Sequence, residues 1–187
     1  MWPSPGKWTY ADYCKLPDDG RRYEVIRGFL YVSPAPSLPH QRALGRLFVK
    51  LHLFVLAGGL GEVLFAPVDV LLPREIAAPV QPDLMFFRTG NQPGAEAMNF
   101  KGVPDLVVEI LSPSTRRLDK VLKLDAYERC GVQTYWIFDR VRKGVQPYER
   151  TDDRLRPWPF LSAAQEDILT SPLLPGFELA LADLFEE

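Results

Sequence analysis

Two acidic side chains interrupt strings of apolar residues in the middle of this sequence. Glu109 lies within "LVVEIL" (106–111), and Asp83 follows a proline in "VQPDLMFF" (80–87). An ionised carboxylate among apolar side chains costs several kcal/mol unless a cation, a proton or hydrogen bonds compensate it. Two such sites in one chain suggest that both carboxylates bind the same cation.

The spacing of the acids decides which of them can meet. Asp105 and Glu109 belong to one expected strand, in which four residues span roughly 13 Å. Oxygen ligands of one metal ion lie ~2.0–2.6 Å from it, so we expect Asp105 to be the solvated start of its strand instead. Asp83 is the better partner, because residues facing each other on adjacent strands have Cβ atoms ~4.5–5.5 Å apart. The sequence permits this register and does not fix it.

The elements that must position these acids follow from the apolar pattern. Residues 40–57 carry leucines at helical spacing, and the glycines of "GGLG" (58–61) end that helix. Strands are expected at 62–73, 79–88, 104–112 and 133–139, with a helix within 112–131 before the last. A crossover helix makes the last two strands parallel neighbours, whereas the shorter earlier loops favour antiparallel pairing. A mixed sheet with helices packed on it results.

The two ends of the chain add smaller elements. A short helix is expected at 9–16, a hairpin over 21–33 with its turn at Arg27–Gly28, one more strand near Val145, and a short helix at the end. We see no linker, so we expect one domain over 1–187. Its core would lie at about 40–139, its N-terminal helix and hairpin at 9–33, and its C-terminal extension at 145–187.

Composition limits the class of protein. The chain has 187 residues, of which 47% are hydrophobic and 25% charged, and its net charge is −2. It has no apolar run of ~18 residues and no secretory signal at its start, so we expect a cytoplasmic protein without a membrane partner.

Cys14 and Cys130 lack metal-ligand spacing and are expected to be half-buried thiols. A net charge near zero does not decide about nucleic acid, because the local field matters more than the sum.

The motifs together resemble a known family. An Asp after Pro on the second strand and a Glu on the third, in the order helix, three strands, helix, strand, are similar to the core of the PD-(D/E)XK nuclease superfamily. The strings "YEVIRG", "SPAPSLPHQR", "PVDVLLP", "VQPDLMFF", the block 104–139 and "SPLLPGFELALADLF" resemble the Uma2 family, in its order, from about residue 21 to 185. The resemblance implies an α/β fold, a restriction endonuclease-like mixed β-sheet flanked by helices (core order αβββαβ).

The resemblance also implies a metal site and an activity. Asp83 and Glu109, with Glu24 of "YEVI", would bind a divalent cation, Mg²⁺ or Mn²⁺. The implied reaction is endonucleolytic hydrolysis of phosphodiester bonds of nucleic acid, with DNA the expected partner, by metal-activated water. Proteins of this fold commonly pair to cut both strands, so we expect a homodimer or higher homo-oligomer.

One position departs from the superfamily pattern. The superfamily's lysine stands two residues after the glutamate, where this chain has Leu111. The Uma2 pattern has a lysine on the following helix, and Lys123 matches it. Asp119, Lys123 and Tyr127 would form one stripe on that helix, from which Lys123 could reach the acids. His40, in "PHQR", also matches a family position and could contact a phosphate or a metal-bound water.

Each assignment has a structural alternative. Glu109 and Asp83 could be paired acids, Glu24 a solvated strand residue, and Lys123 a solvated partner of Asp119. His40 could be an exposed residue at a helix start, and Asp69 either a further ligand or a locally hydrogen-bonded strand aspartate. The basic residues expected to contact nucleic acid could form solvated helix faces; they are Arg42, Arg46, Lys50, Arg116 and Arg117.

Two other functions fit part of the sequence. A catalytically inactive nuclease-fold module could bind DNA or a protein partner, and the leucine at 111 keeps this reading open. Glycoside hydrolysis by paired carboxylates fits the acids but leaves the lysine and the basic helix face without a role.

Overall fold

A seven-stranded mixed sheet forms the central layer of the protein, seen in a computed structural model that describes residues 2–73 and 76–185. Its strand order is β10-β9-β8-β7-β5-β3, and β11 pairs with β9. The strands of this sheet are β3 (Gly61–Phe65), β5 (Leu84–Arg88), β7 (Leu106–Ile110), β8 (Thr134–Asp139), β9 (Gly144–Thr151), β10 (Arg154–Pro157) and β11 (Leu161–Ser162).

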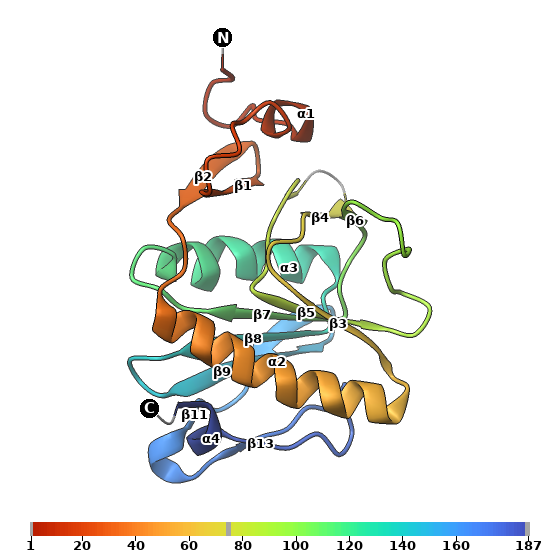
Figure 1. Ribbon diagram of the computed structural model, residues 1–187, viewed down its shortest axis with the longest axis vertical. Helices are drawn as coiled ribbons and strands as arrows, with labels where there is room; N and C mark the ends of the chain where they lie inside the picture. Colours follow the sequence, from red (N-terminus) through yellow and green to blue (C-terminus); the bar gives the residue numbers. More distant parts are fainter. Residues whose placement is uncertain (1, 74–75, 186–187) are drawn as a thin grey trace.

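Helices cover both faces of this sheet. The long helix α2 (Leu38–Gly58) lies across one face, and the π-helix η2 (Leu118–Lys123), which continues into α3 (Leu124–Cys130), lies on the other (Figure 1). The expected order of helix, three strands, helix and strand is confirmed by α2, β3, β5, β7, η2–α3 and β8. Smaller elements complete the chain: α1 (Tyr10–Tyr13), β1 (Arg22–Ile26), β2 (Phe29–Ser33), β4 (Val70–Leu71), β6 (Phe100–Lys101), η3 (Ala163–Gln165), β12 (Ile168–Leu169), β13 (Leu179–Ala180) and α4 (Leu181–Phe185).

The central strands are mainly apolar because both of their faces are buried. Side chains alternate between the faces: Leu84 and Phe86 pack in the cluster under α2, whereas Met85 and Phe87 pack in the cluster on the side of η2 and α3. Each of the four has 0% of its surface exposed. The sheet therefore forms a rigid layer from which a polar side chain can be held in place.

The pairing of the strands follows the expected pattern. β7 and β8 are parallel, whereas β3–β5 and β5–β7 are antiparallel. In the β5–β7 pair, Leu84 lies opposite Val108. Extending this register by one residue brings Asp83 opposite Glu109, the pairing that the sequence permitted but could not fix.

An N-terminal hairpin lies apart from the sheet, beside α1 (Figure 1). Its strands β1 and β2 are joined by Arg27 and Gly28, whose φ angles of 52° and 73° match a two-residue turn. Val25 in β1 exchanges backbone hydrogen bonds with the segment before β5, through the carbonyl of Pro79 and the amide of Ala78. These bonds hold β1 against the start of β5.

Several boundaries differ from those expected. The expected strand 62–73 is interrupted between β3 and β4, and the expected strand 79–88 becomes β5 only at Leu84, because Pro67, Pro79 and Pro82 have no N–H for a ladder. The helix within 112–131 begins at Leu118, and the one at 9–16 spans only four residues. The last third contains several short strands where one was expected. In the described part of the chain, none of the helices is long and apolar enough to cross a membrane.

Candidate active site

Asp83 is held at the start of β5 by two basic side chains and a backbone amide. Arg22 Nη1 donates to Asp83 Oδ1 at 2.8 Å, and His40 Nε2 lies 3.0 Å from Oδ2. The amide of Ile110, on the neighbouring strand β7, donates to the same Oδ2 at 2.8 Å. Because a carboxylate only accepts, the proton of a neutral His40 lies on Nε2, and His40 Nδ1 has no hydrogen-bond partner among the described residues.

A second group of acids surrounds the ammonium of Lys123. Its Nζ lies 2.8 Å from Glu109 Oε1, 2.9 Å from Glu24 Oε1 and 3.6 Å from Asp119 Oδ1. The hydroxyl of Tyr127 donates to Glu109 Oε1 at 3.1 Å. Only 2% of Lys123 is exposed, so these contacts replace almost all of its water. The ammonium absent from position 111, where Leu111 is buried in the core, is thus supplied to Glu109 from the helix.

Local backbone geometry explains how each side chain reaches this place. Glu24 lies on β1, and its Oε1 also accepts from the amide of Gln81 at 2.7 Å. The π-helix η2 carries Asp119 and Lys123, and α3 follows with Tyr127. Single π turns widen the spacing of side chains along a helix and recur at functional sites. Here all three side chains of the expected stripe are buried and directed to the acids.

Burial, hydrogen bonds and neighbouring charges together lower the pKa of Asp83 but raise the pKa values of Glu109 and Asp119. Burial would raise the pKa of Asp83, but the hydrogen bond from His40 and the charge of Arg22 hold it well below its usual value. Burial, together with the charges of Asp119 and Asp83, raises the pKa of Glu109 well above its usual value in spite of Lys123. Burial likewise raises the pKa of Asp119 to about 6.

Lys123 remains charged in this environment. Burial alone would lower the pKa of its ammonium, but the charges of Glu109, Glu24 and Asp119 raise it above its usual value. Lys123 therefore cannot act as a base near neutral pH. It can donate hydrogen bonds and neutralise negative charge.

The balance of charges shows what the cluster lacks. Four carboxylates (Glu24, Asp83, Glu109, Asp119) line one cavity together with three permanent cations, Arg22, Lys123 and Arg140, of which Arg22 and Lys123 pair with the carboxylates. The ionised carboxylates thus outnumber these cations by one, an excess that a proton or a divalent cation can meet, and carboxylate oxygens suit a hard ion such as Mg²⁺. As arranged, however, no three His, Cys, Asp or Glu side chains in the described ranges form a metal-ligand set. The carboxylate oxygens have the donor chemistry that a divalent ion requires. To bind such an ion, the carboxylates would give up their present contacts with Arg22 and Lys123.

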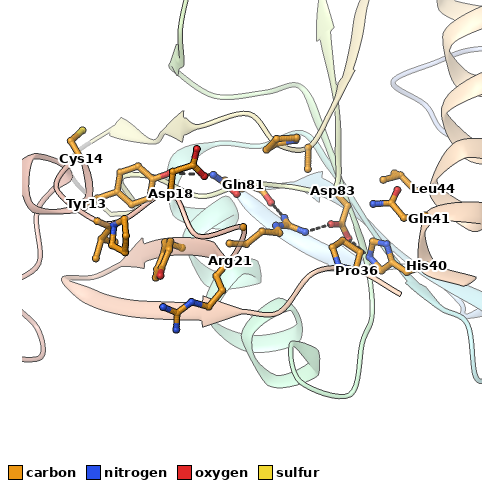
Figure 2. A pocket seen from close by; sticks show the side chains of 17 residues that line it. Tyr13, Cys14, Asp18, Arg21, Pro36, His40, Gln41, Leu44, Gln81 and Asp83 are labelled. Carbon is orange, nitrogen blue, oxygen red and sulfur yellow. Dashed lines mark hydrogen bonds and ion pairs between the residues drawn. The ribbon is translucent and has the colours of Figure 1, made fainter. Parts of the chain in front are cut away.

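Two cavities meet at Asp83. The cavity with the four carboxylates has a volume of about 220 Å³. Arg22, Pro36, His40 and Asp83 also line a second cavity of about 480 Å³, which extends toward α1. Figure 2 shows this second cavity, with His40 and Asp83 near one end and Tyr13 and Cys14 near the other. A ligand that enters from this side would reach Asp83.

The structure brings together the five residues that the sequence indicated: Glu24, His40, Asp83, Glu109 and Lys123 line a single cavity. Sequence reasoning missed Arg22 as a member of the site and assigned Asp119 only an ion pair with Lys123. A signal for Arg22 was present, because residues two apart on a strand share a face, and Glu24 is on the same strand.

Other predicted residues lie elsewhere. Asp105 does not reach the site, as expected, but it is not solvated: it is 8% exposed and accepts from the amide and Nε of Arg88 and from Asn91. The strand start is buried because the 89–91 turn covers it. Asp69 accepts from Tyr13 and Gln81, away from the acids.

The basic residues predicted to contact nucleic acid are spread over two regions. Lys50 pairs with the exposed Asp183, and Arg116 pairs with Asp139, while Arg117 is exposed. Arg42 and Arg46 line a separate cavity beside the carboxylates. Cys14 and Cys130 are not joined in a disulfide; Cys14 is exposed, not half-buried as expected, and Cys130 is half-buried.

Comparison with known proteins agrees with this architecture. Residues 10–182 match the family described as "Uma2: Putative restriction endonuclease". Among solved structures, the chain is similar to "a putative nuclease belonging to DUF820 from Anabaena variabilis", with a TM-score of 0.81, 20% identity, and coverage of 95% of this chain and 97% of that one. The type IIG restriction endonuclease BpuSI matches with a TM-score of only 0.41 and 12% identity, covering 82% of this chain and 16% of that one. No curated protein matches.

Proposed function

The chain belongs to the Uma2 family, and from that premise we propose that it is a metal-dependent endonuclease that hydrolyses phosphodiester bonds of DNA. The observation that carries the proposal is the position of Lys123, whose ammonium lies 2.8 Å from Glu109 and 2.9 Å from Glu24. An acid cluster with a buried ammonium from a neighbouring helix has the components of a nuclease site, although the strand position that usually supplies the ammonium holds a leucine.

Asp83, Glu109 and Glu24 would hold the divalent cation, Mg²⁺ or Mn²⁺. When bound, such an ion supplies Lewis-acid polarisation of the phosphate and lowers the pKa of a bound water. Asp83 is suited to binding because its pKa is held low, so it is ionised at every physiological pH. Glu109 and Asp119, whose pKa values are raised, would give up protons when the cation binds.

The remaining polar side chains would bind and orient the substrate. The protonated Lys123 can donate to a non-bridging phosphate oxygen and offset the negative charge that develops there. His40 donates from Nε2 to Asp83, so its Nδ1 is the atom that can accept a proton or a hydrogen bond. Arg22 lines both the carboxylate cavity and the second cavity, where it can bind an adjacent phosphate once it leaves Asp83.

Nicking of supercoiled plasmid with Mg²⁺ or Mn²⁺ tests this function. We expect the wild type to nick, and Glu109→Gln and Lys123→Met to lose at least 100-fold in rate, because each removes a charged group of the site. Asp105→Asn is the matched control: it removes a carboxylate from the entry to the same strand, outside the cavity, and should retain cleavage. Equal rates in all variants would show a contaminating nuclease and refute the assignment.

A second function is favoured by one observation, namely that Arg22 and Lys123 already pair with the carboxylates and that no metal-ligand set is formed in the described residues. In that case the protein is a nuclease-fold module that binds DNA without cutting it. Isothermal titration with Mn²⁺ separates the two functions: an active site binds the ion in wild type and loses it in Asp83→Asn, and an inactive module binds none. Pairing of two copies stays a prediction, which analytical ultracentrifugation at micromolar concentration can check.

A further inference from the structure

A basic cavity opens beside the carboxylate site. It has a volume of about 670 Å³ and is lined by Arg42 and Arg46 from α2 and by Arg140 and Lys143 from the turn between β8 and β9. Its other walls are apolar or small, and none of the described residues that line it is acidic. Four positive charges thus converge on one cavity of a protein whose net charge is −2.

Three of these cations lack an ion-pair partner within the described ranges. Arg42, Arg140 and Lys143 make no salt bridge there, in contrast to Lys50 further along α2, which pairs with Asp183, and Arg116, which pairs with Asp139. Arg46 Nη1 donates to the carbonyl of Leu184 at 3.3 Å, so it is fixed at the wall. The like charges of Arg42, Arg140 and Lys143 repel one another, and an anion bound between them removes that cost.

Arg140 connects this cavity to the candidate active site. It lines the basic cavity and also the cavity that contains Asp83, Glu109 and Lys123. The fold explains why: the start of α2, the end of β7 and the turn after β8 lie at the same end of the central strands (Figure 1). A nucleic-acid strand that places one phosphate at the carboxylates can therefore continue past Arg140 into the basic cavity.

We propose that Arg140, Arg42, Lys143 and Arg46 form a phosphate-binding track that holds the nucleic-acid backbone next to the cleavage site. The proposal rests on the function proposed above and adds where the strand runs. The contacts are to phosphate, so they position the backbone and carry no information about base sequence. Such a track explains how a protein with net negative charge can bind a polyanion through its local field.

The salt dependence of DNA binding tests the track. A labelled duplex of arbitrary sequence is titrated in EDTA by fluorescence anisotropy between 50 and 200 mM salt, so that binding is measured without cleavage. The logarithm of affinity falls with the logarithm of salt by about 0.9 per phosphate contact. Arg42→Ala/Lys143→Ala should therefore lower the slope by about 2, so that wild type loses about tenfold more affinity than the variant over this range.

The matched control is Arg129→Ala/Arg156→Ala, which removes the same charge from exposed positions outside both cavities. It should leave the slope within about 0.5 of wild type, and circular dichroism melting should show that both variants fold. A slope unchanged in the Arg42/Lys143 variant, or equally lowered in the control, would overturn the track. If the slope of the Arg42/Lys143 variant is unchanged while the wild type still nicks plasmid, the phosphate-binding track is refuted but the proposed nuclease function is not. If the wild type neither binds DNA nor nicks plasmid, the proposed function is refuted as well.

Discussion

Removal of the ammonium of Lys123 should destabilise the fold in a pH-dependent way. Lys123→Met keeps the length of the side chain but leaves Glu109, Glu24 and Asp119 without their shared cation, which lies 2.8, 2.9 and 3.6 Å from them. Breaking a buried ion pair from one side costs about 3–5 kcal/mol. For a chain of this length, each 1 kcal/mol lowers Tm by about 2–4 °C, so we expect a fall of about 6–20 °C at pH 8.

The sign of the pH dependence follows from the carboxyl groups that remain. The pKa of Asp119 is about 6 in the folded protein, above its usual value, and loss of Lys123 removes a cation that lowers it. A carboxyl group whose pKa is higher in the folded state binds protons more readily there, so it costs most stability above the folded pKa and progressively less as the pH falls toward the unfolded value of ~3.9. The defect of Lys123→Met should therefore be full at pH 8 and clearly smaller at pH 5.

Urea unfolding at the two pH values measures this difference. Lys120→Met, on the same π-helix but outside the acid cluster, is the control and should stay within about 0.5 kcal/mol of wild type. Lys123→Met/Glu109→Gln should recover part of the loss, since it removes one of the uncompensated charges. A defect of Lys123→Met below about 1 kcal/mol at pH 8, or one equal at both pH values, would refute the buried-charge argument.

Three further predictions concern neighbouring residues. Asp105→Asn should lower the free energy of unfolding by about 1–3 kcal/mol at pH 7, because Arg88 loses a charged acceptor. The difference from wild type should shrink below pH 4, because the pKa of Asp105 is lowered in the folded state. Urea unfolding at several pH values tests both expectations. Glu149→Gln should be at least as stable as wild type at pH 8, because burial raises the pKa of Glu149; calorimetry showing a loss above about 2 kcal/mol would contradict this. Tyr127→Phe removes the hydroxyl that donates to Glu109 and should cost about 1 kcal/mol in urea unfolding; no loss would show that the bond is not stabilising.

The apolar pattern predicted the layers of the fold because strands and helices with buried faces follow fixed periods. Apart from Glu109, the run 106–111 is apolar on both faces, which is typical of a central strand, and the crossover after it required a parallel neighbour. The register of β5 against β7 could not be predicted, since it depends on backbone pairing. It places the position of Asp83 opposite Glu109, so the meeting of the two acids needed the structure.

The residues missed were those whose position depends on tertiary contacts. Arg22 belongs to a hairpin that lies outside the sheet, and tertiary contacts such as the backbone bonds between Val25 and the segment 78–79 bring it to Asp83. The π-helix has no sequence signature that we could use, although it carries Asp119 and Lys123. The burial of Asp105 arises from Arg88 and Asn91, residues 17 and 14 positions away in sequence, which a strand pattern does not show.

The hairpin also sets the order in which the site can form during synthesis. Arg22 and Asp83 are 61 positions apart in sequence, and Glu24 and Lys123 are further apart. The ribosome must therefore release the whole span 22–123 before Asp83 and Glu24 can both pair with their cations. Contacts at such long range also slow folding, because the entropy of closing the loop is lost before the contact stabilises the chain. A nascent or truncated chain that ends before residue 123 of the 187 therefore lacks the ammonium, and any activity that depends on it is withheld until that residue has been released.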